Sequence, residues 1–167
     1  MKVREIMTDE PKCCGPDTDL AAATELMWSN DCGVLPVVED GKLVGIVTDR
    51  DICMALGTRN GRAAETAVKD VATRGVQTCG PDDDVNTAMA IMRRAKVRRL
   101  AVVDDGKLAG MLALNDIILA AEPRYGTVDY EEVMTTMKAV SEHRGAKKPA
   151  APSVVPTQWP PIPVPVA

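Results

Sequence analysis

Two short segments, 65 residues apart, contain the side chains with the clearest chemical potential. Residues 45–51 read GIVTDRD and residues 110–116 read GMLALND, so a glycine, two apolar positions and a final aspartate recur. In the first segment Thr48 precedes Asp51 by three residues, the spacing at which a hydroxyl and a carboxylate can cap the start of a helix. The same two groups could instead hold a ligand, and the spacing alone favours neither interpretation.

The second segment differs at the position of the hydroxyl, because Ala113 stands where the first segment has Thr48. An alanine side chain cannot cap a helix. Asn115 could cap instead, which would leave Asp116 in the first helical turn, where a carboxylate complements the helix dipole. Capping therefore explains the first segment more completely than the second.

A cluster of cations lies shortly before the second segment. Residues 93–100 read RRAKVRRL and carry five positive charges in eight positions. A solvated helix end, where cations complement the helix dipole, is the simpler interpretation of the first three, Arg93, Arg94 and Lys96. Arg98 and Arg99 differ because they stand directly before the apolar run LAVV, and the matching positions in the first half of the chain carry no charge.

Both segments belong to an internal duplication. Residues 3–54 and 68–119 align without gaps at an offset of 65, and 19 of the 52 aligned positions are identical. In each copy, apolar residues recur at helical spacing after a Gly-Pro turn, and an Asp-Gly pair then separates two apolar runs. Each copy therefore predicts a helix, a hairpin of two strands and a second helix. The expected ranges are 34–38 and 43–47 for the first hairpin, and about 49–56 and 115–121 for the second helices.

A single unit of about 55 residues buries too little surface to be stable by itself. We therefore expect an α/β (α+β) fold, in which two repeats of β-α-β-β-α type pack sheet to sheet around a shared core. Their pseudo-two-fold symmetry would create two equivalent clefts. The expected boundaries are 1–60 and 61–122 for the repeats, 123–148 for a C-terminal amphipathic helix and 149–167 for a Pro-rich tail.

Four features together resemble a tandem pair of cystathionine β-synthase (CBS) domains, also called a Bateman module. They are the openings VREIMT and VKDVAT, the hairpin segments GVLPVVEDGKLVGIV and RRLAVVDDGKLAGML, the closing Gly-h-h-Thr-x-x-Asp motif (h, apolar), and the duplication in register. The resemblance covers about residues 1–121. The sequence is similar in particular to the small stand-alone CBS pairs of bacteria and archaea, which carry no attached enzyme domain.

The resemblance implies a regulatory ligand of adenosine type, such as AMP, ADP, ATP or S-adenosylmethionine, and no catalytic cofactor. A carboxylate can accept hydrogen bonds from both ribose hydroxyls, and a guanidinium offers two parallel donors to phosphate. Carried over by position, the ribose and phosphate contacts are Thr48, Arg50 and Asp51 in the first copy and Asn115 and Asp116 in the second, with Arg98 and Arg99 reaching phosphate. The base of the first ligand would lie against Val76, Thr78 and Val97, and that of the second against Lys12, Cys13 and Cys32.

Composition argues against several classes of function. The chain has a net charge of −4 and a pI near 5.1, whereas nucleic-acid-binding domains are usually basic. No apolar run approaches the roughly 18 residues that a membrane span needs. The five cysteines form no Cys-x-x-Cys pair and the one histidine is His143, so we expect reduced thiols and no metal site. No catalytic triad or phosphate loop is present either. We expect a cytoplasmic protein that is not an enzyme and binds neither nucleic acid nor membrane.

Two further segments follow the repeats. Residues 128–144 predict an amphipathic helix with one apolar face, formed by Tyr130, Val133, Met134, Met137 and Val140. This helix could close over its own module or pair with a partner. Residues 149–167 contain seven prolines and no charged side chain. Such a segment favours a disordered tail, and the run WPPIP is also compatible with a peptide that docks in an aromatic groove.

The interpretation that these observations favour is a regulatory module, which binds the nucleotide between its repeats and signals to a partner by a change in shape. We expect it to form a homodimer. The alternative is a ligand-free interaction or dimerisation scaffold of the stress-associated type. Ala113 and the uncharged first-copy positions, Gly33 and Val34, favour it.

Overall fold

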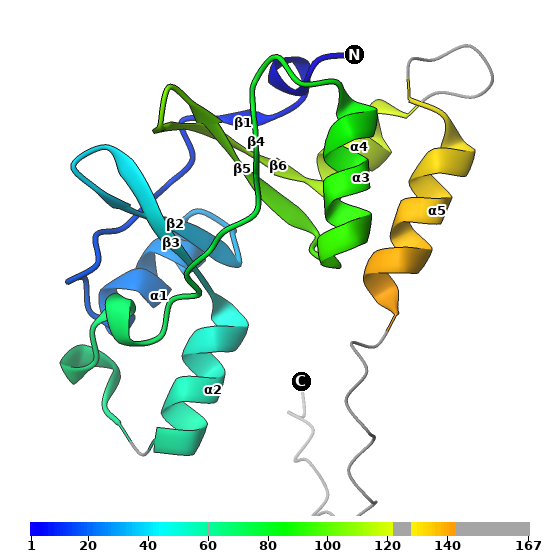
Figure 1. Cartoon of the computed structure of the whole chain (residues 1–167). Helices are drawn as coiled ribbons and strands as arrows, with labels where there is room; N and C mark the ends of the chain where they lie inside the picture. Colours follow the sequence, from blue (N-terminus) through cyan, green and yellow to red (C-terminus); the bar gives the residue numbers. More distant parts are fainter. Residues whose placement is uncertain (60, 122–127, 143–167) are drawn as a thin grey trace, which may run out of the picture.

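The computed structural model describes residues 1–59, 61–121 and 128–142 of the chain, and Figure 1 shows their arrangement. The expected tail, 149–167, and His143 lie outside these residues. The elements follow in the order η1 (Val3–Glu5), β1 (Thr8–Asp9), α1 (Leu20–Ser29), β2 (Val34–Glu39), β3 (Lys42–Thr48), α2 (Asp49–Arg59), η2 (Ala63–Glu65), η3 (Val68–Asp70), β4 (Thr78–Cys79), α3 (Val85–Ala95), β5 (Arg99–Asp104), β6 (Lys107–Ala113), α4 (Leu114–Ala120) and α5 (Tyr130–Ser141).

The expected hairpins are both present. Strands β2 and β3 pair antiparallel, as do β5 and β6. Their turns have positive φ at both central residues, 50° and 76° at Asp40 and Gly41, and 46° and 78° at Asp105 and Gly106. A type I′ turn requires this backbone, and an Asp-Gly pair supplies it at low cost. The α/β fold class predicted from the sequence is therefore confirmed.

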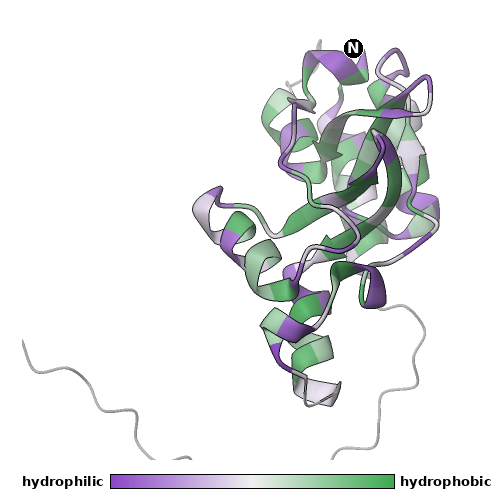
Figure 2. Ribbon diagram, turned by 90° about the vertical axis from the view of Figure 1, so that its left-hand side faces the viewer, coloured by the Kyte–Doolittle hydropathy of each residue, from purple (hydrophilic) through white to green (hydrophobic). Residues whose placement is uncertain are grey.

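The strands form one continuous sheet in the order β2-β3-β6-β5-β4, with β1 also pairing with β6. The two hairpins join through a single pair of residues, Lys42 in β3 and Lys107 in β6. These lysines are themselves equivalent in the duplication, so the junction lies on the pseudo-two-fold axis. Helices flank the strands, and the strands carry much of the hydrophobic colour in Figure 2.

Each repeat completes the other at its N-terminal segment. The amide of Val3 donates to the carbonyl of Asp83, and the amide of Val68 donates to the carbonyl of Thr18, the position equivalent to Asp83. Val3 is buried in the core of repeat 2, and Val68 is buried in the core of repeat 1. The exchange is reciprocal, as pseudo-two-fold symmetry requires.

The buried side chains form two clusters rather than the single shared core that we expected. One lies beneath β2 and β3 with α1 and α2, and includes Leu20, Leu35 and Val47. The other lies beneath β5 and β6 with α3 and α4, and includes Met89, Leu100 and Leu112. The hairpins meet edge to edge, so each hairpin covers the helices of its own repeat. The repeats are therefore joined by the continuous sheet and by the exchanged N-terminal segments, and not by a common core.

Helix α5 packs on α3 and α4 and so closes over its own module, which decides between the two alternatives left open by the sequence. Val133 and Val140 are buried against repeat 2, as the apolar pattern predicted. Two residues expected on the same face, Tyr130 and Met134, are instead half exposed, and Thr136 is fully buried. The helix is thus rotated relative to the predicted face, because the Arg93 guanidinium donates to the Thr136 hydroxyl and satisfies it inside the contact. No helix among the described residues is long and apolar enough to cross a membrane.

Candidate functional site

The start of α2 is closed by the two residues that the sequence singled out. The hydroxyl of Thr48 donates to Asp51 Oδ2 over 2.7 Å, and the Thr48 amide donates to the same oxygen over 3.0 Å. In return, the Asp51 amide donates to Thr48 Oγ1 over 3.2 Å. This is a capping box, so the structural interpretation of the pair is correct. No donor among the described residues reaches the second carboxylate oxygen of Asp51, which leaves one acceptor for a ligand.

The start of α4 keeps only part of this arrangement. The amide of Ala113 donates to Asp116 Oδ2 over 2.8 Å, but no hydroxyl is present to complete the box. The expectation that Asn115 caps α4 is wrong, because the helix begins one residue earlier. The Leu114 amide donates to the Arg98 carbonyl over 2.9 Å, and the Leu114 side chain is buried. Asn115 therefore lies within the first turn, with its side chain exposed.

Three of the predicted site residues meet in one pocket of about 320 Å³ at the start of α4, namely Arg98, Arg99 and Asn115. Helix α5 forms the opposite wall with Met137, Val140 and Ser141. Both arginines are exposed, and neither forms an ion pair with any residue that the structure describes. Their charge is therefore available to an anion.

Most of the remaining predicted contacts line neither this pocket nor the one described next, although Cys32 does line the latter. Val97 packs against the core of repeat 2, and Val76 is half buried. Thr78 is exposed in β4, where it pairs with Ala101. Arg50 is exposed at the start of α2. The contacts of the base with Val76, Thr78 and Val97 accordingly remain predictions.

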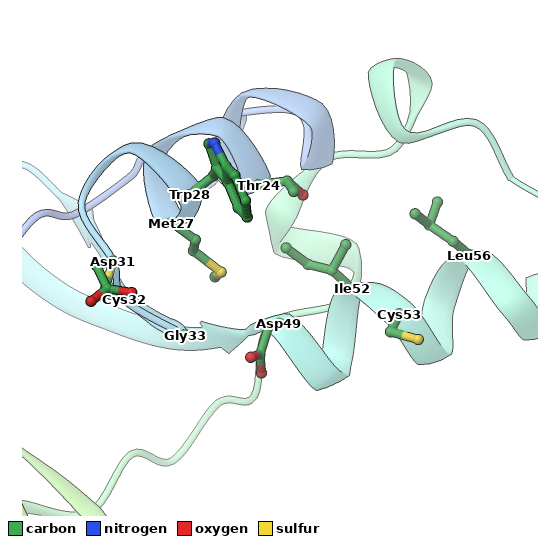
Figure 3. A pocket seen from close by; sticks show the side chains of 10 residues that line it. All are labelled: Thr24, Met27, Trp28, Asp31, Cys32, Gly33, Asp49, Ile52, Cys53 and Leu56. Carbon is green, nitrogen blue, oxygen red and sulfur yellow. The ribbon is translucent and has the colours of Figure 1, made fainter. Parts of the chain in front are cut away.

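Sequence reasoning missed a larger pocket of about 500 Å³ in repeat 1, which we call the α1/α2 groove. Figure 3 shows side chains of both helices along it, Thr24, Met27 and Trp28 from α1 and Ile52, Cys53 and Leu56 from α2. Asp31, Gly33 and Asp49 line one end. The signal that could have revealed it is Trp28, whose side chain is 84% exposed although it follows the buried Met27.

The two pockets overlap only in part when the repeats are aligned. Gly33 in the α1/α2 groove corresponds to Arg98, and Asp49 corresponds to Leu114. A Cβ built on Gly33 would lie 2.8 Å from Asp49 Oδ2, so a side chain at position 33 requires the exposed Asp49 carboxylate to move aside. The repeats therefore differ in charge at the same site, acidic in repeat 1 and basic in repeat 2.

Of the five cysteines, Cys32 and Cys53 line the α1/α2 groove, and the other three line neither pocket. Burial raises the pKa of Cys14 from 9.0 to about 11, and it raises the pKa of Cys79 equally. Both thiols are therefore protonated at neutral pH and act as small buried side chains. Within the described part of the chain, no group of three or more histidine, cysteine or acidic residues could hold a metal ion.

Comparison with known proteins finds the same duplication elsewhere. A CBS domain matches residues 3–58 and a second matches residues 68–122. The CBS domain-containing protein YhcV of Bacillus subtilis is 34% identical over 115 residues, which cover 69% of this chain and 81% of YhcV. An inosine-5'-monophosphate dehydrogenase of Korarchaeum cryptofilum is 32% identical over 140 residues, but the chain spans only 27% of that enzyme.

Solved structures match the whole pair of repeats. The CBS domain pair of protein MJ0100, in complex with 5'-methylthioadenosine and S-adenosyl-L-methionine, is 26% identical with a TM-score of 0.65, over 71% of this chain and 94% of that one. CBSX2 in complex with AMP is 29% identical with a TM-score of 0.63, over the same shares of the two chains. These similarities cover the repeats together, so the arrangement of the two repeats is common to these proteins and to this chain.

Proposed function

Because the chain belongs to the CBS domain family, we propose that it is a regulatory module that binds an adenosine nucleotide between its repeats. The observation that carries the proposal is the pair Arg98 and Arg99, two exposed cations without a described ion-pair partner in an acidic protein. The pocket that they line is formed by repeat 2 and α5, and a nucleotide bound between the repeats would place its phosphates at this pair. A guanidinium offers two parallel donors to a phosphate, so two exposed arginines at one pocket suit an anionic ligand. Solved relatives in complex with AMP and with S-adenosylmethionine support an adenosine-type ligand.

The charge of the pocket discriminates among the candidate ligands. AMP, ADP and ATP carry phosphates that an arginine binds through two parallel hydrogen bonds. S-adenosylmethionine carries a sulfonium and an ammonium group, which two arginines would repel. We therefore expect ATP, ADP and AMP to bind more tightly than S-adenosylmethionine.

The proposed contacts divide between the repeats. Asp51 would accept hydrogen bonds from ribose through its free oxygen, with Thr48 holding the carboxylate in place. Asp116 would act in the same way beside Asn115 in the second repeat. Occupancy would pass to a regulated partner through a change in the relation of the two repeats. We propose that the active form is a homodimer.

A second candidate function is an interaction scaffold whose clefts stay empty. The observation that favours it is that Thr48 and Asp51 already satisfy each other, so the motif has a structural role without a ligand. The loss of the hydroxyl at Ala113 favours it as well.

Calorimetric titration of the full chain with ATP, ADP, AMP and S-adenosylmethionine distinguishes the two functions. We expect the Arg98→Gln/Arg99→Gln variant to bind the tightest of these ligands at least about tenfold more weakly, since two charge-assisted contacts are lost. The matched control is Arg94→Gln, an exposed arginine of the same cationic run that lines neither pocket, and it should change the affinity less than twofold. Absence of binding by all four ligands to the unmodified chain would favour the scaffold.

A further inference from the structure

The α1/α2 groove is a pocket of about 500 Å³ that the proposed function does not use. It exposes the indole of Trp28, and the half-buried Leu56 and the buried Ile52 line it between the helices (Figure 3). Exposed apolar grooves of this kind usually mark a binding site. The duplication supplies a direct comparison for deciding what binds there.

Repeat 2 shows how the equivalent surface is covered. Helix α5 lies against α3 and α4, which correspond to α1 and α2, and buries Val133 and Val140 there. Two ion pairs join α5 to this surface. Arg93 Nη1 lies 2.7 Å from Glu132 Oε2, and Lys96 Nζ lies 2.8 Å from Glu142 Oε2. An acidic helix thus covers a basic surface.

Repeat 1 has the opposite charge at this surface. The positions of Arg93 and Lys96 are taken by Trp28 and Asp31, and Asp49 adds a second carboxylate. Both aspartates are exposed, and neither forms an ion pair with a described residue. A helix with the acidic side chains of α5 would be repelled, so the groove fits an apolar segment that carries positive charge at one end.

We propose that the α1/α2 groove binds the C-terminal segment of the same molecule, residues 144–167. This segment begins with three cations, Arg144, Lys147 and Lys148, and continues as an uncharged stretch rich in proline, valine and isoleucine. The cations would lie at the acidic end of the groove, near Asp31 and Asp49, and the apolar stretch would lie along α1 and α2. This inference is independent of the proposed nucleotide.

Proline-rich segments bind to exposed aromatic rings because the polyproline II conformation is already formed and loses little entropy on binding. Trp28 offers such a ring at the groove. The tail contains its own anchor, the run Trp159-Pro160-Pro161, which can stack on the indole. The groove thus matches the tail in its exposed aromatic ring as well as in its charge.

The segment is long enough to reach the groove from the end of α5. Trp159 stands 18 residues beyond Ser141, and a polyproline II chain spans about 3.1 Å per residue, roughly 55 Å in total. A compact domain of this size is only about 40 Å across. Because the segment is tethered, its effective concentration at the groove is in the millimolar range, so weak contacts suffice to fill it.

The two tryptophans of the chain make the proposal testable by fluorescence. The Trp159→Phe variant of the full chain keeps an aromatic ring that can stack at the anchor position. This variant and a chain that ends at Lys148 both retain Trp28 as their single tryptophan. Both hydrophobic cores are built from residues no later than Val140, so the shortening leaves the packed residues in place. Acrylamide should quench Trp28 at least about threefold less in the full chain, because docking shields an exposed indole.

Charge and shape variants of the Trp159→Phe chain sharpen the test. Asp31→Lys and Cys53→Glu should each restore the quenching seen without the tail, and Asp31→Asn should do so partly. The matched control is Leu119→Glu, which alters an 85% exposed side chain of α4 outside both pockets and should change nothing.

Three outcomes would overturn the proposal. Equal quenching of Trp28 with and without the tail would show that the tail does not cover the groove. Shielding that needs no tail and rises with protein concentration would assign the groove to contact between two copies. Shielding that needs the tail but rises with concentration would mean that the tail binds to another molecule, contrary to the intramolecular docking proposed.

Discussion

The two repeats have the same backbone fold but differ at two equivalent places, the start of the second helix and the exposed face of the helices. At the start of the second helix, repeat 1 has a complete capping box with Thr48 and Asp51. Repeat 2 has Ala113 and retains only the hydrogen bond that the Ala113 amide donates to the Asp116 carboxylate. On the helical face, repeat 1 has an open acidic groove, whereas repeat 2 has a basic surface covered by α5. The residues that make the hairpin turns, by contrast, are identical in the two copies.

This difference separates what the fold needs from what a particular repeat does. The Asp-Gly turns are identical because few residues adopt positive φ at both central positions. The exposed helical face carries no such backbone constraint, so its charge has diverged. The covering helix α5 is present for only one face, which means that repeat 2 contains its own partner and repeat 1 leaves its surface open.

The largest expected effect concerns the dependence of repeat 2 on α5. Val133 is 6% exposed and packs in the core of repeat 2, so Val133→Asp places a charge in an apolar contact. We expect the free energy of unfolding to fall by more than about 3 kcal/mol. Chemical denaturation monitored by circular dichroism measures it.

The neighbouring residue serves as the matched control. Met134 lies in the same helix but is 51% exposed, so Met134→Asp should change the free energy of unfolding by less than about 0.5 kcal/mol. Equal effects of the two substitutions would contradict the packing of α5 described above, and with it the comparison between a covered and an open face.

Much of this fold could be predicted from the sequence, because its signals are local. Asp-Gly pairs, alternating apolar runs and the duplication fix the hairpins and the helices that follow them. The carboxylate of Asp19 caps α1 in the same local way, by accepting from the Ala22 amide over 2.8 Å.

What could not be predicted depends on contacts between distant parts of the chain. At the start of α4, the Leu114 amide donates to the carbonyl of Arg98, directly before β5, and no local pattern reveals this bond. The rotation of α5, with Thr136 buried instead of Met134, depends on Arg93 in α3. The open groove escaped notice because its walls belong to two helices separated by a hairpin. For the candidate site, the sequence predicted a set of residues but not that Arg98, Arg99 and Asn115 share a pocket.

The second expected effect concerns two cysteines at which the repeats agree. The pKa of Cys14 and of Cys79 is raised by burial to about 11, whereas Cys13 and Cys53 are exposed. Iodoacetamide reacts with thiolates, so at pH 8 we expect the two buried thiols to react at least about a hundredfold more slowly than an exposed thiol of ordinary pKa. Mass spectrometry of the modified peptides measures each rate.

The same shift has a consequence for stability. Because the folded state holds these protons more tightly than the unfolded state, it is favoured below pH 9, and this contribution is lost as the pH rises toward 11. If iodoacetamide labels Cys14 but not Cys79, the two N-terminal segments that the repeats exchange do not open equally.

The smallest expected effect tests the capping difference itself, by exchanging one residue in each direction. Thr48→Ala removes the hydroxyl that bonds both the Asp51 carboxylate and the Asp51 amide, and should lower the free energy of unfolding by about 1 kcal/mol. Ala113→Thr introduces a hydroxyl at a residue with extended backbone directly before α4, and should raise it by about 0.5–1 kcal/mol. Thermal and urea denaturation of both variants provide the values. If Ala113→Thr destabilises the chain while Thr48→Ala behaves as expected, the pocket at the start of α4 excludes the threonine side chain. The alanine would then be required by the shape of the pocket that Arg98 and Arg99 line, and its presence would count for a ligand site in repeat 2 rather than against one.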